Sequence, residues 1–142
     1  MPLALHVEDF TQGEAEAFFA AEWPLHDELL GIRWDARDIV LVARGDEPIG
    51  VARGVVVGGV GELKQLLVKK QHARRGVGSL LLLAFEARCR TGGCHKLRLE
   101  TGDYQARPFY ERHGFTVTAA LHDDRFHHDW FVMEKRLAAE RT

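Results

Sequence analysis

A basic, glycine-spaced segment in the middle of the chain has the composition of a phosphate-binding loop. Residues 71–79 read Gln-His-Ala-Arg-Arg-Gly-Val-Gly-Ser, and they lie between the apolar run 66–68 and an apolar helix pattern that extends to about residue 89. Glycines allow backbone N–H groups to point at one ligand, and the start of a helix adds partial positive charge. Arg74 and Arg75 add formal charge and forked donors that fit a phosphate. The segment therefore predicts a site for a phosphorylated ligand.

This segment has other possible interpretations: a structural turn without a ligand, or a loop that binds a nucleotide. Gly-x-Gly before a helix also occurs as an ordinary turn, so a purely structural loop is an alternative. A Walker loop is excluded because the chain has no Gly-x-x-x-x-Gly-Lys-Ser/Thr sequence. A dinucleotide-binding fingerprint requires a third glycine, and Leu81 occupies that position.

A second segment, residues 100–115, is expected to contain the end of a strand, a short helix and a stop at Gly114. Together the two segments resemble the motifs of the GNAT superfamily of acyl-CoA-dependent N-acyltransferases. The first family motif (Gln or Arg, two residues, Gly, one residue, Gly or Ala) falls on residues 73–78. The second (Ala, three residues, Tyr, Glu or Lys, Lys or Arg, one residue, Gly, Phe) falls on residues 106–115. The resemblance covers roughly residues 39–137, and the order and separation of the motifs also fit.

The chain departs from the family pattern at three positions. Ala73 stands where the family has Gln or Arg, and Arg74 stands where it often has Gly. One side-chain donor to a pyrophosphate is therefore missing, and Arg74 or Arg75 can replace it. Asp103 occupies the place of the asparagine that often precedes the second motif. These departures concern the details of cofactor contact rather than the class.

The resemblance implies acetyl-CoA as the co-substrate. The glycine-spaced loop would hold the pyrophosphate, and the backbone of residues 66–68 would bind the pantetheine arm as an added strand. The N–H of Leu67 would contact the thioester oxygen. The residues expected to bind acetyl-CoA are Leu66, Leu67, Val68, Ala73, Arg74, Arg75, Gly76, Val77, Gly78, Ser79, Asp103, Ala106, Phe109 and Tyr110.

Tyr110 is the candidate general acid, because the family's tyrosine occupies this motif position. A phenol with a pKa of about 10 can donate a proton to a thiolate whose own pKa is roughly 8.5 if burial and contacts help. The alternative is that Tyr110 packs with Phe109 and Phe115 as a core residue.

Glu62 is the candidate general base. It lies eleven positions before Ala73, the spacing at which histone-type members of the family place a base glutamate. It could take the amine proton directly or through water. The alternative is an exposed charge at the start of a strand beside Lys64, with Glu100 on the neighbouring strand or a chain of water molecules acting as the base.

A segment rich in histidine and aspartate connects the last two expected strands. Residues 122–129 contain three of each, a composition that could bind a divalent metal. Their spacing fits no standard site, and polar side chains are normal in a surface loop, so we expect a solvated turn and no metal. In the implied fold this loop borders the acceptor cleft, where Asp123, Asp124 and Asp129 would suit a cationic amine.

Local patterns distribute these residues over strands and helices. A capping box of Thr11 and Glu14 predicts a helix to about Trp23, and Pro24 begins a further helical stretch to about Ile32. We expect strands over residues 3–7, 39–44, 49–57, 62–68, 96–101, 115–121 and 130–137, and helices over residues 76–90 and 105–113. A helix joins strands 62–68 and 96–101, so these two should be parallel.

These elements predict an α+β fold, with a mixed, mostly antiparallel sheet, a central splayed parallel pair and helices on both faces. A chain of 142 residues that is 46% hydrophobic fits one N-acetyltransferase domain over residues 1–142.

A net charge of −2 gives no reason to expect nucleic-acid or membrane binding. Cys89 and Cys94 form neither a disulfide framework nor a zinc motif, and no signal peptide opens the chain, so we expect a cytoplasmic protein.

The expected function is transfer of an acetyl group from acetyl-CoA to a primary amine, directly and without a covalent enzyme intermediate. The acceptor could be a small molecule or a protein, and a monomer and a homodimer are both compatible with the sequence. The alternative is a non-catalytic CoA-binding sensor or interaction module with the same fold. We expect the acceptor pocket to come from residues 8–37 and 122–129, where no motif identifies the amine.

Overall fold

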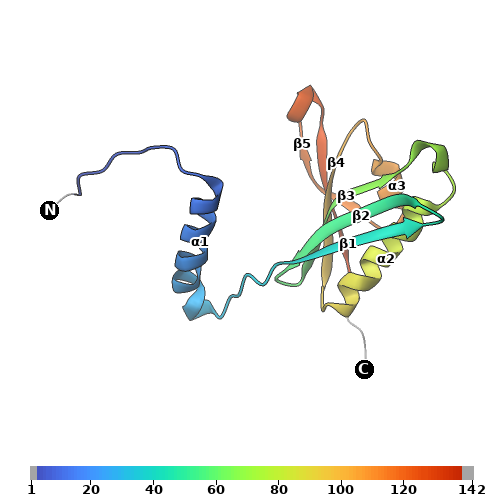
Figure 1. Ribbon diagram of the computed structural model, residues 1–142. Helices are drawn as coiled ribbons and strands as arrows, with labels where there is room; N and C mark the ends of the chain where they lie inside the picture. Colours follow the sequence, from blue (N-terminus) through green and yellow to red (C-terminus); the bar gives the residue numbers. More distant parts are fainter. Residues whose placement is uncertain (1–2, 139–142) are drawn as a thin grey trace. The chain divides into compact units, whose positions relative to one another are not determined.

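The computed structural model of the protein describes residues 3–138. Tertiary contacts group the chain into two compact units, one that ends at Trp34 and one that begins at Asp35. Figure 1 shows the first unit in blue and the second in cyan to red. The second unit contains residues 73–78 and 106–115, the two motifs, and therefore carries the candidate site.

The first unit is a capped helix followed by a short 3₁₀ helix. α1 (Gln12–Asp27) starts after Thr11, whose hydroxyl accepts a hydrogen bond from the N–H of Glu14. The Glu14 carboxylate accepts one from the N–H of Thr11 in return, which confirms the capping box. η1 (Glu28–Leu30) follows, and Gly31 ends it with a φ of 65°.

Two expectations for this unit are wrong. Residues 3–11 have no regular secondary structure, so the expected strand over residues 3–7 is absent. A strand needs a hydrogen-bonded neighbour, and the described part of this unit contains none. The break expected between Trp23 and Pro24 is also absent, because α1 continues through Pro24 to Asp27. The further helical stretch expected to about Ile32 is present as the last turn of α1 and as η1, which ends at Leu30. Pro24 removes one N–H donor but keeps a helical φ, and so the last turn still forms.

The second unit is built on a six-stranded sheet with the order β1-β2-β3-β4-β6-β5. The strands are β1 (Arg37–Arg44), β2 (Pro48–Val57), β3 (Val60–Val68), β4 (Lys96–Gly102), β5 (Thr116–Leu121) and β6 (Trp130–Arg136). All neighbours are antiparallel except β3 and β4, which are parallel. The predicted α+β class, mixed sheet and parallel pair are confirmed, and the strand bounds agree to within two residues.

The helices of this unit lie in the connections of the sheet. α2 (Val77–Thr91) joins β3 to β4, α3 (Arg107–Arg112) joins β4 to β5, and η2 (Lys70–His72) and η3 (Arg125–His127) are short 3₁₀ turns. α2, yellow in Figure 1, packs against β1, β2 and β3. It buries Leu81, Leu82, Phe85 and Cys89, whose three- and four-residue spacing places them on one helix face. This packing fixes the glycine-spaced loop relative to β3. None of the helices described within residues 3–138 is long and apolar enough to cross a bilayer.

β3 and β4 pair over only four residues of each strand before they separate. The last parallel pair is Leu63 with Leu99. On the other side of β3, successive residues of β2 pair with Leu63 and Gln65, so Lys64 is an extra, bulged residue. A bulge bends its strand and increases its twist. β3 therefore turns away from β4 directly after Leu63, which positions the candidate site.

We expect Gly54→Ala to lower the free energy of unfolding by about 1–3 kcal/mol, because an added methyl group overpacks the contact between β2 and α2. A Cβ at Gly54 would collide with the carbonyl oxygen of Glu62 and would lie 2.8 Å from Cζ of Phe85. Denaturant unfolding measures the change. Gly13→Ala is the control, because its Cβ would meet nothing within 4 Å and alanine is favoured inside α1. An unchanged free energy of unfolding for Gly54→Ala would contradict this close packing.

Candidate active site

A cleft of about 490 Å³ lies where β3 and β4 separate. β3 and β4 form its walls from their last parallel pair onward, and the segment before α3, Tyr110 of α3 and the first residue of β6 complete it. The lining residues are Leu63, Lys64, Gln65, Leu66, Leu67, Leu99, Glu100, Thr101, Gln105, Ala106, Tyr110 and Trp130. The parallel ladder does not continue here, so an extended ligand can bind along β3 by adding hydrogen bonds to its backbone.

The glycine-spaced loop meets α2 in the geometry of an anion site. Gly76 is the N-cap of α2 with a φ of 80°, and no side chain in the described structure caps this end. The first N–H groups of a helix have no partner inside the helix, and they form the positive end of its macrodipole. Arg74 and Arg75 are exposed, and Lys70 and His72 precede them in η2. The loop thus combines backbone donors with cationic side chains, as a pyrophosphate requires.

The two sequence motifs meet beside this loop. A Cβ on Gly78 would lie 3.5 Å from Cζ of Phe109 and 3.7 Å from Cδ2 of Leu66, so α2, α3 and β3 converge at this glycine. Oγ of Ser79 lies 2.9 Å from Nε2 of His113, a hydrogen bond that links the first turn of α2 to the end of α3. The fold therefore brings together Leu66, Gly78, Ser79 and Phe109, which the sequence proposes as one site.

Tyr110 lines the cleft and also belongs to the hydrophobic core. Its ring centroid lies 5.1 Å from that of Phe109 and 5.9 Å from that of Phe115. Burial raises the pKa of Tyr110 above its ordinary value. The phenol is therefore protonated at neutral pH, which is the form that a proton donor needs. The two interpretations of this tyrosine are compatible, because the same side chain packs in the core and borders the cleft.

Among the described cleft-lining residues, Glu100 of β4 is the one that carries a carboxylate. Glu62 lies on β3 before the bulge, accepts a hydrogen bond from Nζ of Lys64 at 2.8 Å, and does not line the cleft. The end of the parallel ladder explains the difference, since Glu62 precedes the last pair and Glu100 follows it. The assignment of Glu62 as the base stays a prediction, with Glu100 now in the better position.

Loop 122–129 uses its own acidic side chains to hold its shape. Nδ1 of His127 lies 2.8 Å from Oδ1 of Asp123, and Nδ1 of His122 lies 3.2 Å from Oδ2 of Asp129. The N–H of Asp123 donates to Oδ1 of Asp129 at 2.9 Å. Within residues 3–138, no three histidine, cysteine, aspartate or glutamate side chains are arranged to hold a metal ion. Asp123 and Asp129 therefore shape the loop itself.

Asp103 anchors this loop to the connection between β4 and α3. One of its carboxylate oxygens lies 2.6 Å from Nδ1 of His128, and the other accepts a hydrogen bond from the N–H of Asp129 at 3.1 Å. The N–H of Asp103 donates to the carbonyl oxygen of Asp129 at 2.9 Å. Asp103 does not line the cleft, and its expected contact with the cofactor stays a prediction.

Three residues that the sequence analysis does not single out lie in the cleft or at its rim. Gln105 lines the cleft, and its side-chain oxygen accepts a hydrogen bond from the N–H of Gly102 at 2.8 Å, which shapes the turn before α3. Trp130 also lines the cleft, and its Nε1 donates to the carbonyl oxygen of Arg125 at 3.0 Å. Arg125 in turn approaches Glu100. An aromatic residue at the junction of a polar loop and a strand is the sequence signal that could have identified Trp130.

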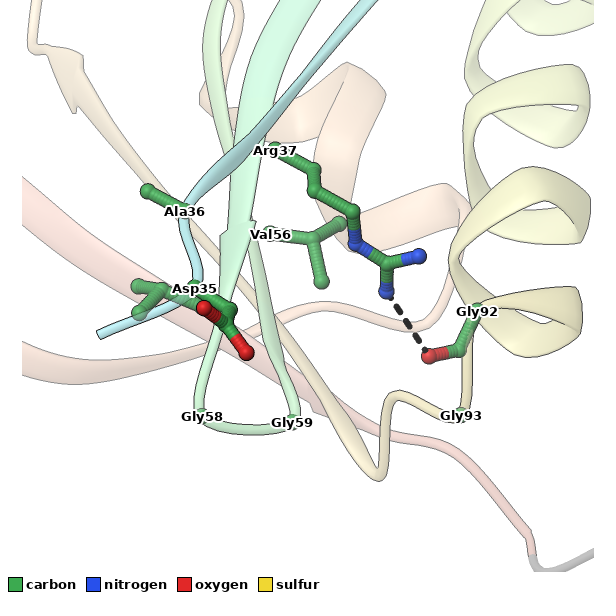
Figure 2. A pocket seen from close by; sticks show the side chains of 9 residues that line it. Asp35, Ala36, Arg37, Val56, Gly58, Gly59, Gly92 and Gly93 are labelled. Carbon is green, nitrogen blue, oxygen red and sulfur yellow. Dashed lines mark hydrogen bonds between the residues drawn. The ribbon is translucent and has the colours of Figure 1, made fainter. Parts of the chain in front are cut away.

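A second cavity, of about 540 Å³, lies at the opposite end of β2 and β3. Figure 2 shows the turn glycines Gly58 and Gly59 in its wall, and Arg37 pointing at the end of α2. The Arg37 guanidinium donates to the carbonyl oxygen of Gly92 at 3.4 Å, where a cation complements the negative end of the helix. Although larger, this cavity contains none of the motif residues, and Arg37 has a structural role in it.

The acetyltransferase (GNAT) family model matches residues 5–115 of the chain. The match contains the glycine-spaced loop, both splayed strands and Tyr110. The chain therefore belongs to the GNAT family, whose members are acyltransferases with a fold that binds acyl-CoA.

Individual relatives agree with this assignment. YjcF, an uncharacterized N-acetyltransferase of Bacillus subtilis, is 33% identical to this chain over 94 residues. The aligned residues cover 66% of this chain and 66% of YjcF, so the chain spans slightly less than two thirds of the length of YjcF. An acetyltransferase from Bacillus cereus has a crystal structure with a TM-score of 0.83 at 24% identity, covering 94% of this chain and 98% of its own. PaiA N-acetyltransferase from Thermoplasma acidophilum, solved in complex with coenzyme A, has a TM-score of 0.61 at 20% identity, covering 90% of this chain and 80% of its own. Both structures share the fold of this chain.

Proposed function

We propose that the protein is an N-acetyltransferase that moves the acetyl group of acetyl-CoA directly to a primary amine. The observation that carries the proposal is the cleft at the β3–β4 separation, with Tyr110 in its wall and the uncapped, basic start of α2 beside it. The family match crosses the boundary between the two units, which supports one N-acetyltransferase domain.

The parts of acetyl-CoA correspond to separate features of this site. The N–H groups of residues 77–79 and the guanidinium groups of residues 74–75 would hold the pyrophosphate. The backbone of residues 66–68 would bind the extended pantetheine arm. Leu67 pairs with Val51 in the same register in which the N–H of Lys69 donates to the carbonyl oxygen of Ile49, so the Leu67 N–H faces β2 and not the cleft. The N–H of Leu66 points away from β2, and it replaces Leu67 as our candidate donor to the thioester oxygen. What acetyl-CoA supplies is an acetyl group activated as a thioester.

Acetyl transfer requires a base for the amine and an acid for the departing sulfur. The amine nitrogen forms a bond to the carbonyl carbon while the C–S bond breaks, so the amine loses one proton and the thiolate gains one. Tyr110 gives its proton to the sulfur. Glu100 takes the amine proton, directly or through water, with Glu62 as the alternative base. The products are an N-acetylated amine and the CoA thiol.

The cysteines favour direct transfer over a covalent enzyme intermediate. Cys89 and Cys94 are free, buried thiols around the C-terminal end of α2. Burial raises the pKa of Cys89 to about 12 and raises that of Cys94 above its ordinary value. A thiol that keeps its proton is a poor nucleophile. Two reduced thiols also fit the cytoplasm, which is the location that we propose.

Saturating acetyl-CoA should raise the melting temperature of the protein. At a hundredfold excess over its Kd, a ligand adds about 2.7 kcal/mol to the free energy of unfolding. Pantetheine lacks the pyrophosphate, and so it should give a much smaller shift at the same concentration. Differential scanning fluorimetry measures both shifts. A melting temperature that does not move with acetyl-CoA would contradict the proposed function.

Gly76→Asp tests the phosphate-binding loop directly. Aspartate would have to adopt the φ of 80°, and its carboxylate would repel the pyrophosphate, so we expect the acetyl-CoA shift to disappear. Gly93→Asp is the matched control, because Gly93 has a similar φ of 84° but follows the end of α2. The control carries the same backbone strain and should keep the shift. Equal loss in both variants would attribute the effect to strain instead of phosphate binding.

A further inference from the structure

We propose that the amine acceptor is an amino acid, or a closely similar amine with a carboxylate next to the reacting nitrogen. This inference rests on the N-acetyltransferase function proposed above and concerns the acceptor part of the same cleft. Glu100 lines the cleft, and Arg125, of opposite charge, lies beside it. An acceptor that carries both charges can pair its ammonium group with Glu100 and its carboxylate with Arg125.

Arg125 is held at this position by a residue of the cleft wall. Nε1 of Trp130 donates to the carbonyl oxygen of Arg125 at 3.0 Å. The Arg125 guanidinium carbon lies 5.8 Å from the centre of the Trp130 ring, within the range of a cation–π contact. Trp130 and Glu100 line the cleft and Arg125 itself does not, so these contacts place the guanidinium beside the cleft wall.

The interaction between Arg125 and Glu100 leaves both groups able to bind a ligand. Nη1 of Arg125 and Oε1 of Glu100 are 3.9 Å apart, which is beyond hydrogen-bond distance. Their side chains are 68% and 40% exposed, so water screens the pair and it adds little stability. A carboxylate can therefore form a forked, charge-assisted pair with the guanidinium without first breaking a strong bond.

The backbone of the loop supports a specific placement of Arg125. Three residues around it that are not glycine have positive φ: Asp123 at 46°, Phe126 at 60° and His127 at 59°. Such conformations are strained, and they persist where surrounding contacts enforce them. The hydrogen bond of Asp123 with His127, and the anchoring of Asp129 by Asp103, supply those contacts.

The remaining charges of the cleft agree with this acceptor class. Lys64, the cation among the described lining residues, is held by Glu62 at 2.8 Å. A diamine would bring its second ammonium group towards Arg125, and the two like charges would repel each other. An amino acid would instead bring a carboxylate there. The site therefore selects a zwitterion over a simple cation.

Acetylation of matched acceptors tests this inference. Each L-amino acid of a panel is compared with its α-carboxamide, which keeps the amine and the size but lacks the negative charge, and kcat/KM is measured by CoA release. The ratio of acid to amide should fall by about tenfold to a hundredfold in Arg125→Gln. Any effect of the lost charge on the nearby Glu100 acts on both acceptors and cancels in the ratio. The comparison between variants cancels the intrinsic difference in basicity between the two amines.

Two further variants separate charge from structure. Arg125→Lys keeps the charge but not the fork, so it should retain part of the preference for the acid. Arg136→Gln removes an exposed arginine that lies opposite Lys96 in the β4–β6 register, at the other end of β4, and it should leave the ratio at its parental value.

The possible outcomes distinguish this inference from the function on which it rests. An acid-to-amide ratio that is the same in the parent and in Arg125→Gln overturns the inference, as does activity confined to amines without a carboxylate. Both results leave the N-acetyltransferase function standing. If the protein acetylates none of the acids, amides or simple amines tested, the inference fails. The proposed function fails with it only if saturating acetyl-CoA also leaves the melting temperature unchanged.

Discussion

Replacing Tyr110 with phenylalanine should lower kcat by between about tenfold and a thousandfold, because it removes one proton donor. Affinity for acetyl-CoA should stay near that of the parent. The ring keeps its packing against Phe109 and Phe115, and only the hydroxyl is lost. Proton donation to sulfur occurs as the C–S bond breaks, so its loss affects the transition state rather than binding.

The pH profile gives the same variant a second readout. Burial raises the pKa of Tyr110, so its protonated form persists to a higher pH than that of an exposed tyrosine. The protonated form is the active one. Activity should therefore be complete at neutral pH and fall only as the pH rises through the raised pKa, above about 10. This alkaline decline should be absent from the residual activity of Tyr110→Phe.

Tyr104→Phe is the matched control, since it removes the hydroxyl of the chain's other tyrosine. Tyr104 packs against His128 and Trp130 and does not line the cleft, so kcat should stay close to the parental value. If Tyr110→Phe loses melting temperature and cofactor affinity together with kcat, Tyr110 is a core residue and another group protonates the sulfur.

The sequence predicts the glycine-spaced loop and the helices beside the cleft well because these elements depend on local structure. Gly76 and Gly78 sit at the junction of a strand, a loop and a helix, and the local pattern is sufficient to predict all three. Tyr110 belongs to a short motif, residues 106–115, and the pattern of this motif predicts the helix on which Tyr110 lies. Gly78 and Phe109 lie close together because β3 and β4 are parallel and α2 connects them.

The charged side chains that border the cleft could not be predicted in the same way. Whether Glu62 or Glu100 borders the cleft depends on where the parallel ladder ends, and the bulge at Lys64 determines that position. A bulge leaves no reliable mark in a single sequence. Arg125 approaches Glu100 of β4, which is far from it in the sequence, and no local pattern relates these two residues.

Replacing Glu100 with glutamine should lower kcat/KM at neutral pH by about a hundredfold to ten-thousandfold, the usual contribution of a general base. An acceptor that binds as an ammonium ion must lose a proton before its nitrogen can attack, and Glu100 is the carboxylate that lines the cleft. Part of the loss should be recovered as the pH rises, because more of the acceptor is then already deprotonated. A pH–rate profile of the parent and the variant measures both effects.

Glu62→Gln is the decisive comparison for this prediction. Both substitutions remove one carboxylate charge with little change of shape, and the two residues lie on neighbouring strands on either side of the last parallel pair. Glu62 is engaged with Lys64 and lies outside the cleft wall, so its replacement should leave the neutral-pH rate near that of the parent. A large loss in Glu62→Gln that is recovered at high pH would instead assign the base to the residue that motif spacing indicates. Small effects in both variants would leave proton removal to water. Both variants replace a carboxylate with an amide, so the difference between their pH–rate profiles indicates which carboxylate acts as the base.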